Sequence, residues 1–183
     1  GFVLQSKVDL RNMKMTVEEA SNKAEKLFNS GYNCAQSVFA TFADEIGIDL
    51  KTALKISQGF GGGMGRMREV CGTVSAMVMV ISYLFGSDDA SDKKSKDECY
   101  KAVQQVSDEF RKMNGSIICR ELLGLVPMGQ SEAALKNKEP IEHKVESSVS
   151  SERTLGYYKK RPCALLCRDA AGIVARFLAQ EKL

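Results

Sequence analysis

Four of the six cysteines in this chain lie where the sequence predicts the start of a helix, a position that suits a thiol to chemistry. The four are Cys34, Cys71, Cys119 and Cys163. The first turn of a helix presents free N–H groups and about half a positive charge. A thiolate is stabilised there, so we expect these thiols to have lowered pKa values and to act as nucleophiles or metal ligands at neutral pH.

The residues that precede each cysteine carry the prediction of a helix start. The first cysteine follows Asn33, a preferred N-cap residue. The last follows Pro162, which indicates a helix start because proline favours the first helical position. The second follows the glycine-rich residues 59–65, and the third lies three residues after Ser116, another good N-cap.

Two kinds of chemistry fit four such thiols. As pairs they would cycle between dithiol and disulfide, and as a set of four they would bind zinc or an iron–sulfur cluster. The intervals of 37, 48 and 44 residues lack the paired Cys-x-x-Cys of most compact metal sites, which favours the redox interpretation. The alternative is that the four are small buried apolar residues. Within the redox interpretation Cys71 is the first candidate for attack, because Arg66 and Arg68 lie nearby in the sequence.

The glycine-rich stretch has two interpretations. Gly61, Gly62 and Gly63, with Arg66, are candidates for binding an anionic ligand or cofactor at the following helix start. The stretch lacks the Lys-Ser/Thr ending of a P-loop and the G-x-G-x-x-G spacing of a dinucleotide site. Close packing of the loop against another helix end is therefore the alternative.

The other reactive side chains are expected to have structural roles. Cys99 lies inside a predicted helix on an apolar stripe. Cys167 lies one turn after Cys163, where it would pack in the core, resolve a disulfide or add a metal ligand. His143 is the only histidine and falls in a polar segment, so a Cys–His catalytic pair is not expected.

Helical periodicity extends through most of the chain, and no segment alternates convincingly enough to predict a strand. Helices are predicted over residues 17–30, 34–47, 50–57, 72–86, 93–114, 116–123 and from 163 onward. We therefore predict an all-α, single-domain bundle of about six to seven helices. Residues 1–15 are predicted as an N-terminal tail, residues 16–183 as the helical domain, and residues 130–153 as a polar surface loop.

Composition excludes several functional classes. The net charge of +3 and the absence of tryptophan argue against nucleic-acid binding. The longest apolar run, residues 70–85, is shorter than the roughly 20 residues of a membrane span. No signal-peptide pattern is present at the N-terminus, so we expect a cytoplasmic protein whose cysteines stay mostly reduced.

Ordered segments of the chain resemble one family. The segments are Asn33-Cys34-Ala35-Gln36-Ser37-Val38, the glycine-rich residues 59–65, Val70-Cys71-Gly72-Thr73-Val74-Ser75-Ala76, Cys119-Arg120-Glu121-Leu122-Leu123-Gly124, and Cys163. They resemble the C_GCAxxG_C_C proteins, small bacterial and archaeal proteins described as redox-active and marked by four cysteines and a Cys-Gly-Ala-x-x-Gly motif. Thr73 and Ala76 replace the alanine and glycine of that motif, and both are small enough to keep close helix packing. The resemblance implies that the four helix-start cysteines are the family's, that Cys99 and Cys167 are extra, and it supplies no substrate.

Three functional hypotheses follow. The favoured one is a thiol–disulfide oxidoreductase or electron-transfer protein whose redox partner is a protein or a small molecule. The second is a zinc or iron–sulfur protein that uses the same cysteines as ligands. The third is a non-enzymatic helical module that binds an anionic ligand. The sequence is also compatible with a homodimer formed through an exposed apolar helix face.

Overall fold

Side-chain caps start the first helices at the residues that the sequence predicts. In the computed structural model, which describes residues 1–5, 8–140 and 146–181, α1 (Val17–Asn29) follows the capping box of Thr16. A second capping box, formed by Asn33 and Gln36, starts α2 (Cys34–Ile46). Asp49 accepts a hydrogen bond from the Thr52 N–H and starts α3 (Leu50–Gln58). The helices that follow are α4 (Gly72–Phe85), α5 (Lys93–Asn114), α6 (Cys119–Leu122), α7 (Gln130–Asn137), α8 (Leu155–Lys160) and α9 (Cys163–Gln180).

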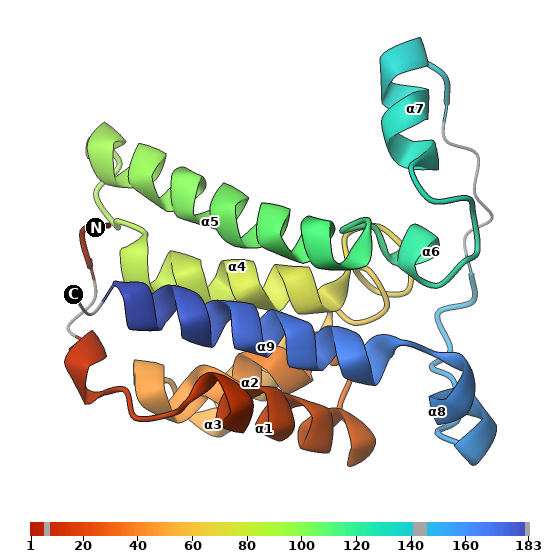
Figure 1. The fold of residues 1–183 in the computed structure, drawn as a ribbon, viewed down its shortest axis with the longest axis horizontal. Coiled ribbons are helices and arrows are strands. Elements are labelled where there is room, and N and C mark those ends of the chain that lie inside the picture. The colour runs from red at the N-terminus through yellow and green to blue at the C-terminus, as the bar shows by residue number, and fades with distance from the viewer. Residues whose placement is uncertain (6–7, 141–145, 182–183) are drawn as a thin grey trace.

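The long helices form a single-domain bundle around two apolar helices, α2 and α4. Figure 1 shows α4, α5 and α9 side by side, with α1 along α9 and with α2 and α3 on the far side. Most of α4 is buried, because its apolar side chains face helices on several sides. The described residues contain no β-strand beyond one isolated bridge, so the prediction of an all-α fold is confirmed. No helix among them combines the length and the apolar character needed to cross a membrane.

The first fifteen residues, predicted as a tail, lie against the bundle where the structure describes them. Leu10 and Met13 are buried, and Leu10 belongs to a short 3-10 helix (Leu10–Asn12). The ring of Phe2 lies 6.0 Å from that of Phe85 and 5.5 Å from that of Phe177. The N-terminal segment thus completes the core at the end of the bundle where α9 ends (Figure 1).

Two short helices occur where the sequence predicts none. The prediction of a polar loop over residues 130–153 is wrong for α7, which covers its first part, and α8 follows at Leu155–Lys160. The helix α7 buries only Ser131 and Ala134, so it lacks the apolar periodicity that reveals a helix in a sequence. An ion pair of 2.9 Å between Glu132 and Lys136 joins residues one turn apart within it.

Candidate functional site

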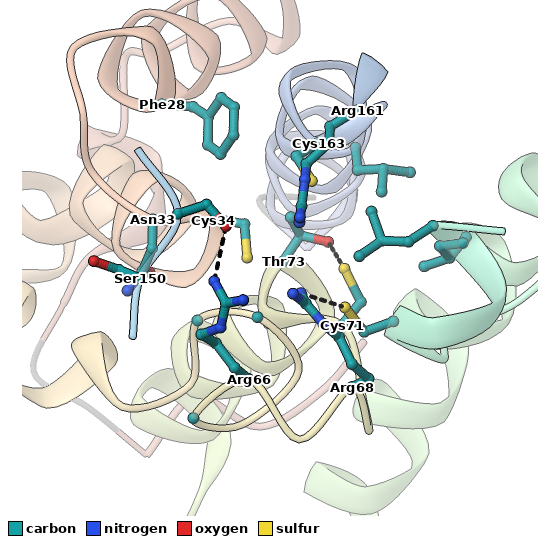
Figure 2. Close-up of a pocket in the computed structure, with 18 of the residues that line it drawn as sticks. Phe28, Asn33, Cys34, Arg66, Arg68, Cys71, Thr73, Ser150, Arg161 and Cys163 are labelled. Carbon is teal, nitrogen blue, oxygen red and sulfur yellow. Dashed lines mark hydrogen bonds between the residues drawn. The ribbon is translucent and has the colours of Figure 1, made fainter. Parts of the chain in front are cut away.

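The starts of four helices meet at one end of the bundle and surround a cavity of about 420 Å3. Its wall contains all four cysteines that the sequence singles out, Cys34, Cys71, Cys119 and Cys163. Cys34, Cys119 and Cys163 are the first residues of α2, α6 and α9, and Cys71 is the N-cap residue of α4. Figure 2 shows Cys34, Cys71 and Cys163 around this space. Tertiary packing thus brings together thiols that lie far apart in the sequence.

A short antiparallel bridge aligns two of the cysteines. Val70 and Ile118 form the bridge, directly before Cys71 and Cys119. The Cys71 N–H donates to the carbonyl of Ile117 at 2.8 Å, and the Cys119 N–H donates to the carbonyl of Glu69 at 2.6 Å. These backbone bonds hold the starts of α4 and α6 side by side. They also explain why α6 begins at Cys119, later than the predicted start at residue 116.

Glycines permit the close approach of the cysteine-bearing segments. A Cβ atom at Gly72 would lie 2.6 Å from the Cys34 sulfur, and one at Gly63 would lie 2.6 Å from the Cys119 Cβ. Atoms cannot approach so closely, so the helix starts converge only because these positions lack a side chain. The structure therefore favours the packing interpretation of the glycine-rich stretch.

Backbone N–H groups of the glycine-rich loop donate hydrogen bonds to carbonyl groups of the same loop. Gly61, Gly62 and Gly63 accept backbone hydrogen bonds from the N–H groups of Arg66, Arg68 and Glu69, respectively, at 3.0–3.2 Å. These N–H groups are not available to cradle a phosphate in the manner of a P-loop. Gly61 and Gly62 nevertheless line the cavity, as does Arg66, so a ligand in the cavity would touch this loop.

Burial reverses the pKa shift that a helix start predicts for these thiols. Loss of solvent raises the pKa of Cys71 far above its ordinary value, and it raises that of Cys163 to about 12. The pKa of Cys119 is also raised by burial, although Arg68 opposes the shift. The expectation of lowered pKa values is therefore wrong for these three cysteines, because desolvation of the thiolate outweighs the helix terminus.

A positively charged side chain lies beside the sulfur of Cys119 and not beside that of Cys71. The Arg68 Nη1 lies 3.8 Å from the Cys119 sulfur, in the geometry of a charge-assisted hydrogen bond. The Arg66 guanidinium instead donates to the Ser147 carbonyl and the Ser151 hydroxyl, both at 2.9 Å. Cys71 is buried, and its sulfur lies 3.1 Å from the Thr73 hydroxyl. The structure gives no support to Cys71 as the first nucleophile.

Cys34 has the most central position among the cysteines. Its proximity raises the pKa of Cys71, Cys119, Cys163 and Cys167, after the larger effect of burial in each case. Cys167 lies behind the cavity wall, fully buried, with its sulfur 3.9 Å from the Cys34 carbonyl oxygen. Cys99 is buried on α5 and does not line the cavity. His143 lies outside the described residues.

Comparison with known proteins agrees with this geometry. Residues 32–177 match the family described as "Putative redox-active protein (C_GCAxxG_C_C)". The chain belongs to this family. It is also 25% identical over 142 residues to an uncharacterised protein of Archaeoglobus fulgidus, a match that covers 73% of this chain and 93% of that protein. No solved structure matches the chain.

The four cysteines of this C_GCAxxG_C_C protein are not arranged as a metal site. Within the described part of the chain, no group of three or more His, Cys, Asp or Glu side chains is placed to hold a metal ion. A zinc site or an iron–sulfur cluster built from these four cysteines would need their thiolates at ligand distance from one metal centre. The sulfur geometry therefore does not support the zinc or iron–sulfur alternative.

Sequence reasoning missed two arginines in the cavity wall. Arg153 and Arg161 line the cavity together with Arg66 and Arg68. Arg161 adjoins the Pro-Cys pair that starts α9, which is a local signal for a role near Cys163. Arg153 lies in the segment predicted as a polar loop, and nothing in its local sequence indicates the site.

The segment 146–153 covers one side of the cavity. Glu146 forms ion pairs with Arg66, at 3.0 Å, and with Arg68, and the Arg68 hydrogen bond is the main reason that the Glu146 pKa is lowered. Ser148, Ser150 and Ser151 contribute to the wall. A segment predicted only as a solvent-exposed loop therefore belongs to the site.

Proposed function

We propose that this protein carries out reversible thiol–disulfide exchange through the cysteines of its cavity. The observation that carries the proposal is that four thiols from four different helix starts line one cavity. Within it they are close enough to shift one another's pKa values. A cytoplasmic location, where thiols are kept reduced between turnovers, is part of this proposal.

We assign the attacking role to Cys119 and the resolving role to Cys34. Arg68 stabilises the thiolate of Cys119, which attacks a sulfur of the oxidised partner and releases one partner thiolate. Cys34 then attacks the Cys119 sulfur and releases the second partner thiolate. The protein gains a Cys34–Cys119 disulfide and loses two electrons and two protons, while the partner disulfide becomes two thiols.

Mass measurement with cysteine variants tests this assignment. Reduced protein is oxidised with a cyclic disulfide, blocked, and its intact mass and linked peptides are compared with those of the reduced form. We expect a reversible loss of two hydrogen atoms per disulfide. We also expect Cys34→Ser and Cys119→Ser to lose the Cys34–Cys119 linkage, whereas Cys99→Ser, the matched control, keeps it. Unchanged oxidation in both cavity variants would show that other thiols react.

A binding function without redox chemistry is the second candidate. It is favoured by the four arginines in the cavity wall. It predicts that an anionic ligand still binds after all four cavity cysteines are replaced by serine. It also predicts that the unmodified protein shows no reversible oxidation by a disulfide, and this second result separates the candidate from thiol–disulfide exchange.

A further inference from the structure

The cavity restricts which oxidised partners can reach the thiols. Cys34, Cys71 and Cys119 are buried, and Cys163 is partly buried. Exchange requires the attacking sulfur to approach the disulfide directly, so a disulfide on the surface of a folded protein cannot reach the attacking Cys119. The volume of about 420 Å3 lies at the lower end of the range for small-molecule sites. The geometry therefore fits a small diffusible substrate.

The wall of the cavity is strongly cationic. Four arginines line it, and the described residues of the wall include no aspartate or glutamate. Glu146, outside the wall, pairs with both Arg66 and Arg68, so among the described residues four positive charges less one negative charge leave three positive charges. A low-dielectric wall concentrates this potential, which attracts anions.

Two arginine N–H groups in this wall are buried and lack hydrogen-bond partners among the described residues. They are Nε of Arg68 and Nη1 of Arg153. Arg68 is only 3% exposed, so leaving a donor unsatisfied there costs free energy unless a ligand or water accepts from it. Arg153 is held in place, since its guanidinium lies 4.5 Å from the centroid of Phe28 and donates to the Tyr32 carbonyl at 2.9 Å.

A third arginine approaches from the opposite side. Figure 2 shows Arg68 and Arg161 extending toward the space among the cysteines from the glycine-rich loop and from the start of α9, respectively. The guanidinium of Arg161 lies 4.9 Å from the centroid of Tyr157. It forms no ion pair with the described acidic residues. The arginines thus provide donors on two sides of the thiols.

We propose that the substrate is a small disulfide with a carboxylate at each end, bound by Arg68, Arg153 and Arg161. This inference rests on the proposed thiol–disulfide function and names its substrate class. Guanidinium N–H groups bind carboxylates through charge-assisted hydrogen bonds, and arginines on opposite walls would place the sulfur–sulfur bond between them, beside Cys119. Attack of Cys119 releases one carboxylate-bearing thiolate, and resolution by Cys34 releases the second.

The test compares three disulfides that differ in charge. Reduced protein is mixed with dithiodipropionate, neutral bis(hydroxyethyl) disulfide or cationic cystamine, and each rate of protein oxidation is divided by that of mercaptoethanol with the same disulfide. We expect the normalised rate to be roughly tenfold higher for dithiodipropionate than for the neutral disulfide, and lowest for cystamine. Added salt should reduce this preference, because it screens charges at the cavity mouth.

Arginine variants assign the preference to the cavity. Arg153→Gln and Arg161→Gln should each lower the ratio of anionic to neutral rates several-fold. Arg176→Gln is the matched control on α9, where Arg176 pairs with Glu109 and does not line the cavity, and it should keep the ratio. If either cavity variant keeps the full ratio, that arginine does not bind the substrate, and the proposed role is overturned.

A non-reactive analogue separates failure of this inference from failure of the redox function. In suberate two methylene groups replace the sulfur atoms of dithiodipropionate, and we expect it to raise the Tm where octanediol and diaminooctane do not. Equal normalised rates for all three disulfides, without stabilisation by suberate, would overturn the anionic substrate and leave thiol exchange standing. Stabilisation by suberate without oxidation by any disulfide would support the anion site and overturn the proposed function.

Discussion

Arg68 and Cys119 form the one pairing of a guanidinium with a cavity thiol within hydrogen-bond range in the described structure, with Nη1 3.8 Å from the sulfur. Burial and this arginine act in opposite directions on the Cys119 pKa, and burial is the larger effect. Cys71 and Cys163 have no such partner, and their thiols remain protonated at neutral pH. At the scale of single residues, the position of one guanidinium therefore distinguishes Cys119, the proposed nucleophile, from the neighbouring cysteines.

Replacing Arg68 should slow the reaction of Cys119. In Arg68→Gln the opposing charge is lost, so the Cys119 pKa rises further and its thiolate fraction falls. We expect alkylation of Cys119 by iodoacetamide at pH 8 to slow several-fold, measured by peptide mass after timed quenching. The control Arg176→Gln should react like the unmodified protein. A faster reaction in Arg68→Gln would show that access, not charge, limits Cys119.

The raised pKa of Cys163 should make stability depend on alkaline pH. The unfolded thiol titrates near its ordinary pKa of 9.0 and the folded thiol near 12, so between these values the unfolded state loses its proton first. The stabilising contribution is complete below pH 9 and is lost as the pH rises toward 12. Urea unfolding across this range should show a falling free energy of unfolding. The decline should be shallower in Cys163→Ala, and an identical decline would contradict the assignment.

At the scale of elements, the site depends on how closely helix starts approach one another. The start of α4 passes the start of α2 at Gly72, and the glycine-rich loop passes α6 at Gly63. The backbone bridge between Val70 and Ile118 then fixes α4 beside α6. These backbone contacts position the thiols, and an ion pair of 2.8 Å between Glu69 and Arg120 also joins the loop to α6.

Adding one methyl group at the contact between α2 and α4 should destabilise the fold. In Gly72→Ala the new Cβ meets the Cys34 sulfur and the Phe60 carbonyl oxygen within 2.7 Å, so the helix starts must separate. We expect a loss of about 1–3 kcal/mol in the free energy of unfolding, measured in urea. Gly59→Ala is the matched control, because a Cβ there meets no atom within 4 Å and its φ is −66°. A similar loss in both variants would point to glycine content and not to this contact.

At the scale of the whole molecule, the cavity and the contacts of the N-terminal segment lie at opposite ends of the bundle. The cavity is built from the starts of α2, α4, α6 and α9, whereas the aromatic cluster of Phe2, Phe85 and Phe177 lies near the ends of α4 and α9. The N-terminus lies at that second end (Figure 1), where the Phe2 N–H donates to the Glu181 carboxylate at 2.6 Å. The N-terminal segment therefore stabilises the bundle without touching the site.

Truncating Phe2 should separate these two properties. Phe2→Ala removes ring contacts with Phe85 and Phe177, and because Phe2 is only partly buried we expect a loss of about 1–2 kcal/mol. The rates at which iodoacetamide alkylates the cavity thiols should stay unchanged under conditions where the variant is fully folded. Altered rates in the folded variant would indicate coupling along the bundle.

The sequence by itself determines the helices that have local signals. Thr16, Asn33 and Asp49 cap their helices through hydrogen bonds to residues three positions later, and such bonds depend on nearby residues alone. The same local reasoning identifies the four cysteines as one set, and the family match confirms the resemblance that they carry. Local reasoning fails for α7, because this helix buries too few residues to show an apolar periodicity in the sequence.

Only the tertiary structure decides how the thiols behave. Burial comes from surrounding helices, so no local pattern reveals that desolvation raises the pKa of Cys71 and Cys163 against the helix-start effect. Contacts between residues far apart in the chain also bring the four thiols to one cavity. The same kind of contact places Arg153, from a segment without a helical pattern, in the cavity wall. Local hydrogen bonds depend on neighbouring residues and can be predicted from the sequence, whereas solvation and charge at a site depend on the whole fold.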